Sequence, residues 1–105
     1  MIAFAALAAA AITAAAAPDP VLSAKGARLY GQLCARCHGP ELVNPGTNAF
    51  DLRQFPADGH ERFIHSVSKG RNAMPAWEDS VTADEIEALW AYVSSHAAAP
   101  QTAGN

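Results

Sequence analysis

The stretch "GARLYGQLCARCHGP", residues 26–40, places both cysteines of the chain and one histidine within five consecutive positions. Two residues separate Cys34 from Cys37, and His38 follows directly. This spacing suits a redox-active dithiol, part of a zinc site, or the attachment point of a larger cofactor. The remainder of the sequence is needed to choose among these three kinds of site.

Cofactor attachment accounts best for the spacing. A structural zinc site needs four ligands, and no second cysteine pair follows. A thioredoxin-like dithiol belongs in a β-α-β pattern, and none surrounds these residues. Two thiols one helical turn apart can each add to a vinyl group of haem, and the adjacent imidazole then faces the iron. The pattern therefore predicts covalently attached haem c, anchored by Cys34 and Cys37, with His38 as an iron ligand.

A second iron ligand is predicted in "GRNAMPAWED", residues 70–79. Met74 is the only methionine after the first residue. A lone methionine is more often core filler, but Pro75 and the neighbouring Gly and Asn residues indicate an extended loop. A thioether in such a loop can be directed at a metal, so we expect Met74 to be the other axial ligand.

The remaining histidines are weaker candidates for that ligand. His60 and His65 fall five residues apart on one predicted helix, so they face different sides of it. His96 lies at the end of the last predicted helix. All three are interpreted as exposed or helix-end residues.

Periodicity predicts three helices, with expected bounds of Ser23 to Ala35, Asp58 to Gly70, and Thr82 to about Ser95. Ser23 is expected to cap the first helix. Capping boxes are expected to start the other two, because Glu61 and Glu85 each lie three residues beyond a capping side chain. Inward-facing residues of these two helices are expected to be Phe63, Ile64, Val67, Ile86, Leu89, Trp90 and Val93.

The segment between His38 and Asp58 shows no sustained period and reads as a long ordered loop. A loop of this length needs a reason in a compact domain, and wrapping the edge of a haem is one. Phe50, Leu52 and Phe55 are then expected to line the haem pocket rather than a protein core. Membership of a small satellite cluster is the alternative.

The first seventeen residues, "MIAFAALAAAAITAAAA", contain no charged side chain. They are at the short limit for a membrane span and end on small residues, which favours a secretory signal over an anchor. We expect a signal peptide over residues 1–17, cleaved after Ala16 or Ala17. A single domain over 18–96 and a flexible tail over 97–105 are expected to follow.

The packing residues of the outer helices carry a family resemblance. Gly26 and Tyr30 in the first helix, with Leu89 and Tyr92 in the last, stand at the spacing by which the terminal helices cross in class I c-type cytochromes, which this chain resembles. Close approach of two helices explains the glycine. The resemblance implies an all-α cytochrome c fold, with three main helices and long loops around one haem c. It also implies His38 and Met74 as axial ligands, and a periplasmic carrier in a bacterial host.

Further pocket residues are predicted around the haem. In the resembled family a carbonyl from a Pro-containing loop accepts the ligand imidazole's other N–H, and Pro45 is the candidate here. Arg53 and Arg71 are candidates to pair with haem propionates, because guanidinium groups match carboxylates. Trp77 is expected either to donate its indole N–H to a propionate or to close the pocket. Arg36, inside the motif, is expected to face solvent.

A narrower resemblance concerns the redox partners. The segments "NPGTNAFDLRQFP", "GRNAMPAW" and "LWAYV" look like those of small cytochromes found beside pyrroloquinoline-quinone-dependent (PQQ-dependent) alcohol dehydrogenases. This implies a carrier that accepts electrons from a dehydrogenase donor and passes them towards a terminal oxidase. Nothing in composition or spacing identifies either partner.

Function follows from an iron with both axial positions filled, which exchanges electrons by outer-sphere transfer and turns over no substrate. An electron carrier that is not an enzyme is therefore predicted; a haem sensor or peroxidase-like protein with an exchangeable sixth ligand is the alternative, and a thiol redox protein a third class. The net charge of −3 argues against nucleic acid as a partner. A monomer that docks transiently, with no stable membrane insertion after signal cleavage, is expected.

Overall fold

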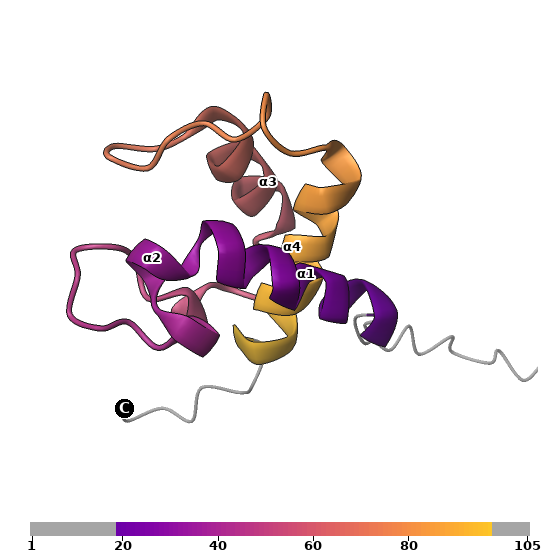
Figure 1. Ribbon diagram of the computed structural model, residues 1–105, viewed down its shortest axis with the longest axis horizontal. Coiled ribbons are helices and arrows are strands. Elements are labelled where there is room, and N and C mark those ends of the chain that lie inside the picture. The colour runs from indigo at the N-terminus through magenta and orange to yellow at the C-terminus, as the bar shows by residue number, and fades with distance from the viewer. Residues whose placement is uncertain (1–18, 98–105) are drawn as a thin grey trace, which may run out of the picture.

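The computed structural model describes residues 19–97, and in this range the chain is helical (Figure 1). Its elements are α1 (Pro20–Leu33), α2 (Ala35–His38), the 3-10 helices η1 (Pro40–Leu42) and η2 (Leu52–Gln54), α3 (His60–Lys69) and α4 (Ala83–Ala97). The predicted all-α class is confirmed. The expected signal peptide and all but the first residue of the expected tail lie outside the described residues. Within 19–97, no helix is both long enough and apolar enough to cross a bilayer.

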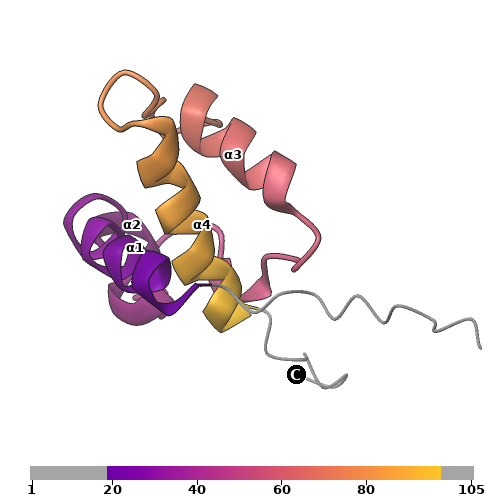
Figure 2. The ribbon, with the colours of Figure 1, turned by 90° about the vertical axis from the view of Figure 1, so that its right-hand side faces the viewer.

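The crossing of α1 and α4 organises the fold. Gly26 is buried, and a Cβ at this position would collide with the backbone carbonyl of Ala88 in α4. The rings of Tyr30 and Tyr92 meet across the same crossing, with centroids 5.2 Å apart. This is the predicted helix contact, and the structure confirms it. Figure 2 shows α4 lying between α1 and α3.

The start of α1 differs from the sequence prediction. The helix begins at Pro20 rather than Ser23, because the Asp19 carboxylate caps it and accepts a hydrogen bond from the Val21 N–H at 2.9 Å. Proline at the first helical position is favoured, since its missing N–H would have no partner there. Ser23 instead lies inside the helix, with its hydroxyl 3.4 Å from that of Ser95. The helix ends at Leu33, two residues before the predicted end.

One of the two predicted capping boxes forms. At α4, the Thr82 N–H donates to the Glu85 carboxylate at 2.9 Å, and the Glu85 N–H donates to the Thr82 hydroxyl at 3.1 Å. The predicted cap of α3 by Asp58 is wrong, because the N-cap residue is Gly59 and no side chain caps the helix there. A Cβ at Gly59 would lie 2.6 Å from the Phe55 ring, so packing determines this residue.

The core gathers apolar residues from all three longer helices, from the segment between α2 and α3, and from the loop that precedes α4. Its buried members are Tyr30, Leu42, Leu52, Phe55, Phe63, Val67, Val81, Ile86, Leu89, Tyr92 and Val93. Leu52 and Phe55 therefore belong to the protein core, where the sequence had predicted a pocket-lining role instead. Phe50 differs from both, because the residue is 47% exposed.

Candidate cofactor site

The cysteine and histidine motif forms a separate short helical turn. Cys34 ends α1, where its N–H donates to the Tyr30 carbonyl at 2.9 Å. Its own carbonyl then accepts from the N–H groups of Cys37 at 3.2 Å and His38 at 3.0 Å. The motif thus sits on α2, just beyond the helix that the sequence predicted would carry it. Cys34 is partly buried, Cys37 is exposed, and the two thiols are not joined by a disulfide.

The surroundings of Cys34 do not suit a redox-active thiol. Burial, with a smaller contribution from Cys37, raises the pKa of the Cys34 thiol to about 11. Thiols used in redox catalysis have lowered pKa values, since the thiolate is the reactive form. Within residues 19–97, no three His, Cys, Asp or Glu side chains are grouped to hold a metal ion. Neither observation favours thiol redox chemistry at Cys34 or a metal ion held by described His, Cys, Asp and Glu side chains alone.

The imidazole of His38 is held by a backbone carbonyl. Its Nδ1 lies 2.9 Å from the carbonyl oxygen of Phe50, twelve residues further along the chain. Nδ1–H is the donor in that bond, so Nε2 is the ring nitrogen left to bind a metal. The assignment of this carbonyl to Pro45 is wrong. Pro45 instead packs near Gly39, where a Cβ would lie 2.9 Å from the proline Cδ.

The loop that delivers the Phe50 carbonyl is organised by two polar side chains that the sequence analysis missed. The Asn44 side-chain oxygen accepts the N–H groups of Gly46 and Thr47 at 2.8 and 2.9 Å, and its amide donates to the Ala49 carbonyl at 2.7 Å. The Thr47 hydroxyl donates to the Cys37 carbonyl at 2.6 Å. The loop is thus tied to the motif itself. An Asn before Pro-Gly is a recognisable turn signal and could have identified Asn44.

Gly39 and Tyr30 fix the chain immediately after His38. Gly39 has φ +91°, and a Cβ there would collide with the Val43 carbonyl. The buried Tyr30 hydroxyl donates to the Gly39 carbonyl at 2.7 Å. The residue that packs α1 against α4 therefore also anchors the end of the motif.

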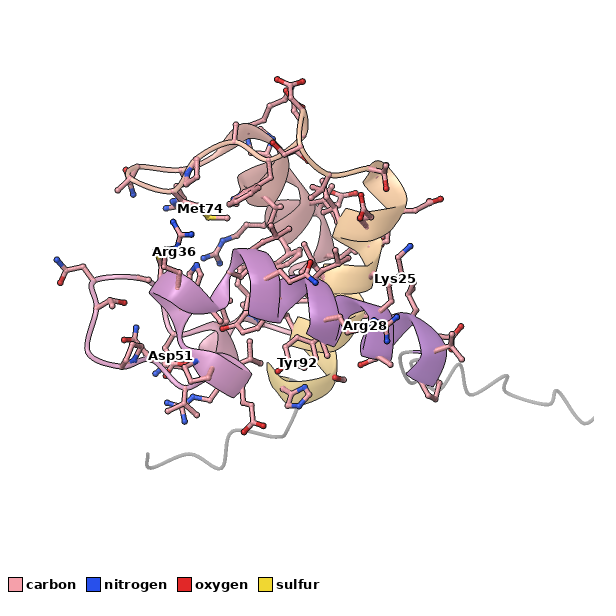
Figure 3. All side chains as sticks on the ribbon, in the orientation of Figure 1. Lys25, Arg28, Arg36, Asp51, Met74 and Tyr92 are labelled. Atoms are coloured by element: carbon pink, nitrogen blue, oxygen red, sulfur yellow. The ribbon has the colours of Figure 1, made fainter. Side chains whose placement is uncertain are left out.

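Met74 lies in the loop predicted for it, and this loop is braced at both ends. Arg71 and Met74 exchange two backbone hydrogen bonds, of 3.1 and 2.9 Å, which close a tight turn. A Cβ at Gly70 would lie 2.7 Å from the Met74 carbonyl, so only glycine lets the turn pack this closely. Beyond Met74, the Trp77 N–H donates to the Val67 carbonyl of α3 at 2.9 Å. Met74 itself is partly buried against the core. Figure 3 shows it on the same side of the molecule as Arg36 of α2, whereas Lys25 and Arg28 lie on α1, farther from Met74 than Arg36 is.

The predicted propionate partners lie in different environments. Arg53 is engaged with Asp51, through Nε at 3.0 Å and a terminal nitrogen at 3.0 Å, which argues against its predicted propionate role. This pairing lowers the pKa of the Asp51 carboxyl. Arg71 and Arg36 are exposed, and Trp77 is partly buried against the core.

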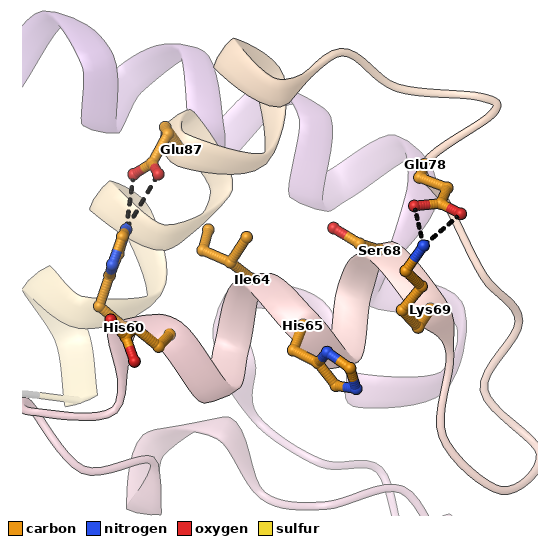
Figure 4. Close-up of a pocket in the computed structure, with 8 residues that line it drawn as sticks. His60, Ile64, His65, Ser68, Lys69, Glu78 and Glu87 are labelled. Atoms are coloured by element: carbon orange, nitrogen blue, oxygen red, sulfur yellow. Dashed lines mark hydrogen bonds and ion pairs between the residues drawn. The ribbon is translucent and has the colours of Figure 1, made fainter.

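The other histidines occupy the exposed or helix-end positions predicted for them. His60 begins α3 and its Nε2 lies 2.8 Å from the Glu87 carboxylate of α4. This pair and the Lys69–Glu78 ion pair border a shallow groove of about 390 Å³ (Figure 4). His65 is exposed on the same face. In α4, His96 Nδ1 lies 3.0 Å from the Tyr92 carbonyl.

Comparison with known proteins places this fold and motif in a family. Residues 22–93 match the family model described as "Cytochrome C oxidase, cbb3-type, subunit III". The match spans well over half of the chain and includes the motif turn, the Met74 loop and the helix crossing. The chain therefore belongs to this family and is a cytochrome c domain.

Individual relatives fall into two groups. The chain is 35% identical over 79 residues to cytochrome c6 of Parathermosynechococcus lividus, covering 71% of this chain and 91% of that protein. It is 37% identical over 83 residues to the quinohemoprotein alcohol dehydrogenase ADH IIB of Pseudomonas putida, covering 76% of this chain and 12% of the enzyme. The solved quinohemoprotein alcohol dehydrogenase ADHIIG of Pseudomonas putida HK5 superposes with a TM-score of 0.70 and 29% identity, over 81% of this chain and 13% of the enzyme. The chain thus spans about an eighth of the curated dehydrogenase that it matches.

Members of this family carry one covalently bound haem c with its iron. The donor set seen here fits that group, because two unpaired thiols precede an imidazole whose Nδ1 is already fixed. Met74 presents a partly buried thioether in a braced loop, and a thioether is a soft donor of the kind that binds haem iron in cytochromes c.

Proposed function

We propose that this chain is a periplasmic single-electron carrier in which Cys34 and Cys37 anchor haem c and His38 and Met74 bind its iron. The observation that carries the proposal is the bond between His38 Nδ1 and the Phe50 carbonyl. It fixes the ring and its tautomer, and metal-binding histidines are oriented in this way. A histidine that only filled space would not need its ring orientation fixed by a carbonyl. The two unpaired thiols beside it favour cofactor binding as the reason.

Haem iron between an imidazole and a thioether supplies one-electron exchange with no open coordination position. The chain keeps both donors in place. The Phe50 carbonyl holds His38, and the Asn44 and Thr47 bonds hold the loop that presents this carbonyl. Gly70 and the Arg71–Met74 turn hold the thioether. Such bracing limits the movement of both ligands when the iron changes charge, which favours fast transfer.

The same proposal extends to the surroundings of the haem. Phe50, which is half exposed beside the His38 contact, would cover one edge of the group. Pro45 would shape the loop on the same side, and Arg71 and Trp77 would lie near the propionates from the Met74 side. These four positions are proposals from the sequence and from their places in the two loops.

For partners, we propose a quinoprotein alcohol dehydrogenase as donor and a terminal oxidase as acceptor. The donor is supported by the likeness to chains named quinohemoprotein alcohol dehydrogenases, about an eighth of whose length this chain spans. A separate carrier is supported by the likeness to cytochrome c6, nearly all of which the chain covers. Export to the periplasm, with removal of a signal peptide, is supported by the uncharged first seventeen residues. The carrier is proposed to act as a monomer.

Replacement of Met74 tests the ligand assignment. In the wild-type protein we expect a low-spin spectrum in both oxidation states, with the weak red band of a ferric iron to methionine bond. Met74→Ala should lose this band, bind carbon monoxide and show a sharply lower potential, whereas Met74→His should remain low-spin at a lowered potential. A wild-type protein that is high-spin and binds carbon monoxide readily would instead support the sensor or peroxidase-like function.

A kinetic test addresses the partner. Purified quinoprotein alcohol dehydrogenase, supplied with an alcohol, should reduce the oxidised chain faster than it reduces an unrelated c-type cytochrome of similar potential. Equal rates for the two cytochromes would count against a dehydrogenase donor, while leaving the carrier function itself intact.

A further inference from the structure

Arg62 of α3 has an unusual position for an exposed arginine. Its guanidinium carbon lies 4.8 Å from the centroid of the Phe55 ring and 5.9 Å from that of the Phe50 ring. The two rings meet edge to face, 6.1 Å apart, and Phe55 is buried. Contact with aromatic faces fixes the direction of a guanidinium group without neutralising its charge.

The charge of Arg62 has no carboxylate partner in residues 19–97. The ion pairs of this range join Arg53 to Asp51, His60 to Glu87 and Lys69 to Glu78, and none includes Arg62. Its fork of N–H donors therefore remains available to an anion. Arg53, the arginine that the sequence favoured for this role, already binds a carboxylate of the chain.

Phe50 connects Arg62 to the iron ligand. The ring of Phe50 lies under the guanidinium, and the backbone carbonyl of the same residue accepts the bond from His38 Nδ1. Arg62 thus contacts the side chain of the same residue whose backbone carbonyl orients the His38 imidazole. The propionates are the anionic groups of the haem c that His38 would hold, and Arg62 is a cation beside the loop that orients His38.

We propose that Arg62 binds a haem propionate, in place of Arg53, and sets part of the reduction potential through its charge. This inference rests on the proposed function. A guanidinium matches a carboxylate with two parallel hydrogen bonds, and the two phenyl rings would hold it in the required direction. Arg62 acts as a positioning and electrostatic residue, because a positive charge beside the haem favours the reduced form, whose iron carries one charge fewer.

The test compares two substitutions of Arg62, by side chains of similar length. Arg62→Met keeps apolar cover over the rings but removes the charge, and should shift the midpoint potential to lower values. Arg62→Lys keeps the charge, so its midpoint potential should lie close to the wild-type value. The control is Arg28→Met, which removes the same charge from an exposed position on α1, away from Met74 (Figure 3), and should leave the potential nearly unchanged.

Infrared redox difference spectra report on the propionate directly. Arg62→Met should shift the propionate carboxylate bands, and Arg28→Met should not. If Arg62→Met retains the wild-type bands and potential, the inference is overturned. The inference is equally overturned if the potential falls but Lys restores none of it, since packing alone would then explain the loss. The weak red absorption band of the iron to methionine bond, recorded in the same samples, separates the two proposals. If the band is present, the proposed carrier function stands even where the inference about Arg62 fails.

Discussion

The hydroxyl of Tyr30 joins the helix crossing to the motif, and its removal should cost stability. Tyr30→Phe leaves the Gly39 carbonyl buried without the 2.7 Å bond that it accepts now. An unsatisfied buried acceptor costs about 1–3 kcal/mol. We expect a loss of this size in the free energy of unfolding, measured by urea titration. Tyr92→Phe is the control, because the Tyr92 ring packs at the same crossing while its hydroxyl makes no hydrogen bond within residues 19–97.

The same residue should make the protein sensitive to alkali. Burial is the main reason that the pKa of Tyr30 is raised well above its ordinary value. A tyrosine of the unfolded chain ionises near pH ~10, so above this pH the unfolded state loses a proton that the folded state keeps. The stabilisation is complete below pH ~10 and is lost as the pH rises further. Urea titrations between pH 8 and 11 should show a smaller alkaline loss in Tyr30→Phe than in the wild type; an unchanged loss would contradict the assignment.

Gly70 should determine whether Met74 reaches the iron. Gly70→Ala places a Cβ 2.7 Å from the Met74 carbonyl at a residue with φ +77°, so the turn must move. We expect a weaker red band to methionine and a lower potential. Gly46→Ala is the matched control, since Gly46 also has positive φ but a Cβ there meets nothing within 4 Å. Strain of about 1–2 kcal/mol applies to both variants, so a spectral change in both would show that strain, and not the Met74 contact, is responsible.

Individual residues also show what sequence reasoning can reach. Cys34, Cys37, His38 and Met74 could be proposed from the sequence because their own side chains would carry the chemistry, and the first three stand at a local, recognisable spacing. The partner of His38 could not, because it is a backbone carbonyl, and every residue has one. Which carbonyl arrives there depends on the path of the loop, which Asn44 and Thr47 determine, and so Phe50 takes the place predicted for Pro45.

Among the elements, α1 and α4 depend most on a single residue. Gly26→Ala would drive a Cβ into the Ala88 carbonyl and separate the two helices. Overpacking typically costs about 1–3 kcal/mol and occasionally more. Because the Ala88 backbone cannot rotate away as a side chain can, we expect a large fall in the melting temperature or a failure to fold. Gly31→Ala, on the same helix, meets nothing within 4 Å and should stabilise the protein by about 0.5–1 kcal/mol through helix propensity. Equal effects of the two substitutions would show that the crossing is not the cause.

Helix ends illustrate which elements a sequence specifies. The capping box of α4 was predictable because both of its hydrogen bonds join Thr82 and Glu85, which are three residues apart in the sequence. The start of α3 was not, because the same pattern at Asp58 competes with the packing of Gly59 against Phe55. At α1, the signal was in the sequence, as Asp19 directly before Pro20, and it lay one turn earlier than the serine that periodicity favoured.

At the scale of the whole molecule, charge is unevenly distributed along the chain. The net charge is −3, yet every Lys and Arg lies between residues 25 and 71, and 72–105 contain five acids and no Lys or Arg. Exposed Arg36 and Arg71 lie on the motif turn and the Met74 turn, and so flank the candidate site from both sides. A partner that approaches there meets positive charge on a protein that is negative overall.

Electron exchange with small charged reagents tests this polarity. If local charge governs the encounter, oxidation by ferricyanide, an anion, should slow as salt rises, by up to about tenfold between ~10 mM and ~0.5 M. Net charge predicts the opposite, because two anions repel and salt would relieve that repulsion. Stopped-flow rates for the double variant Arg36→Gln/Arg71→Gln should lose the slowing. The double variant Lys25→Gln/Arg28→Gln removes the same charge from α1, away from Met74, and should keep it. A wild-type rate that rises with salt would mean that the net charge of the molecule, rather than Arg36 and Arg71, controls how partners approach.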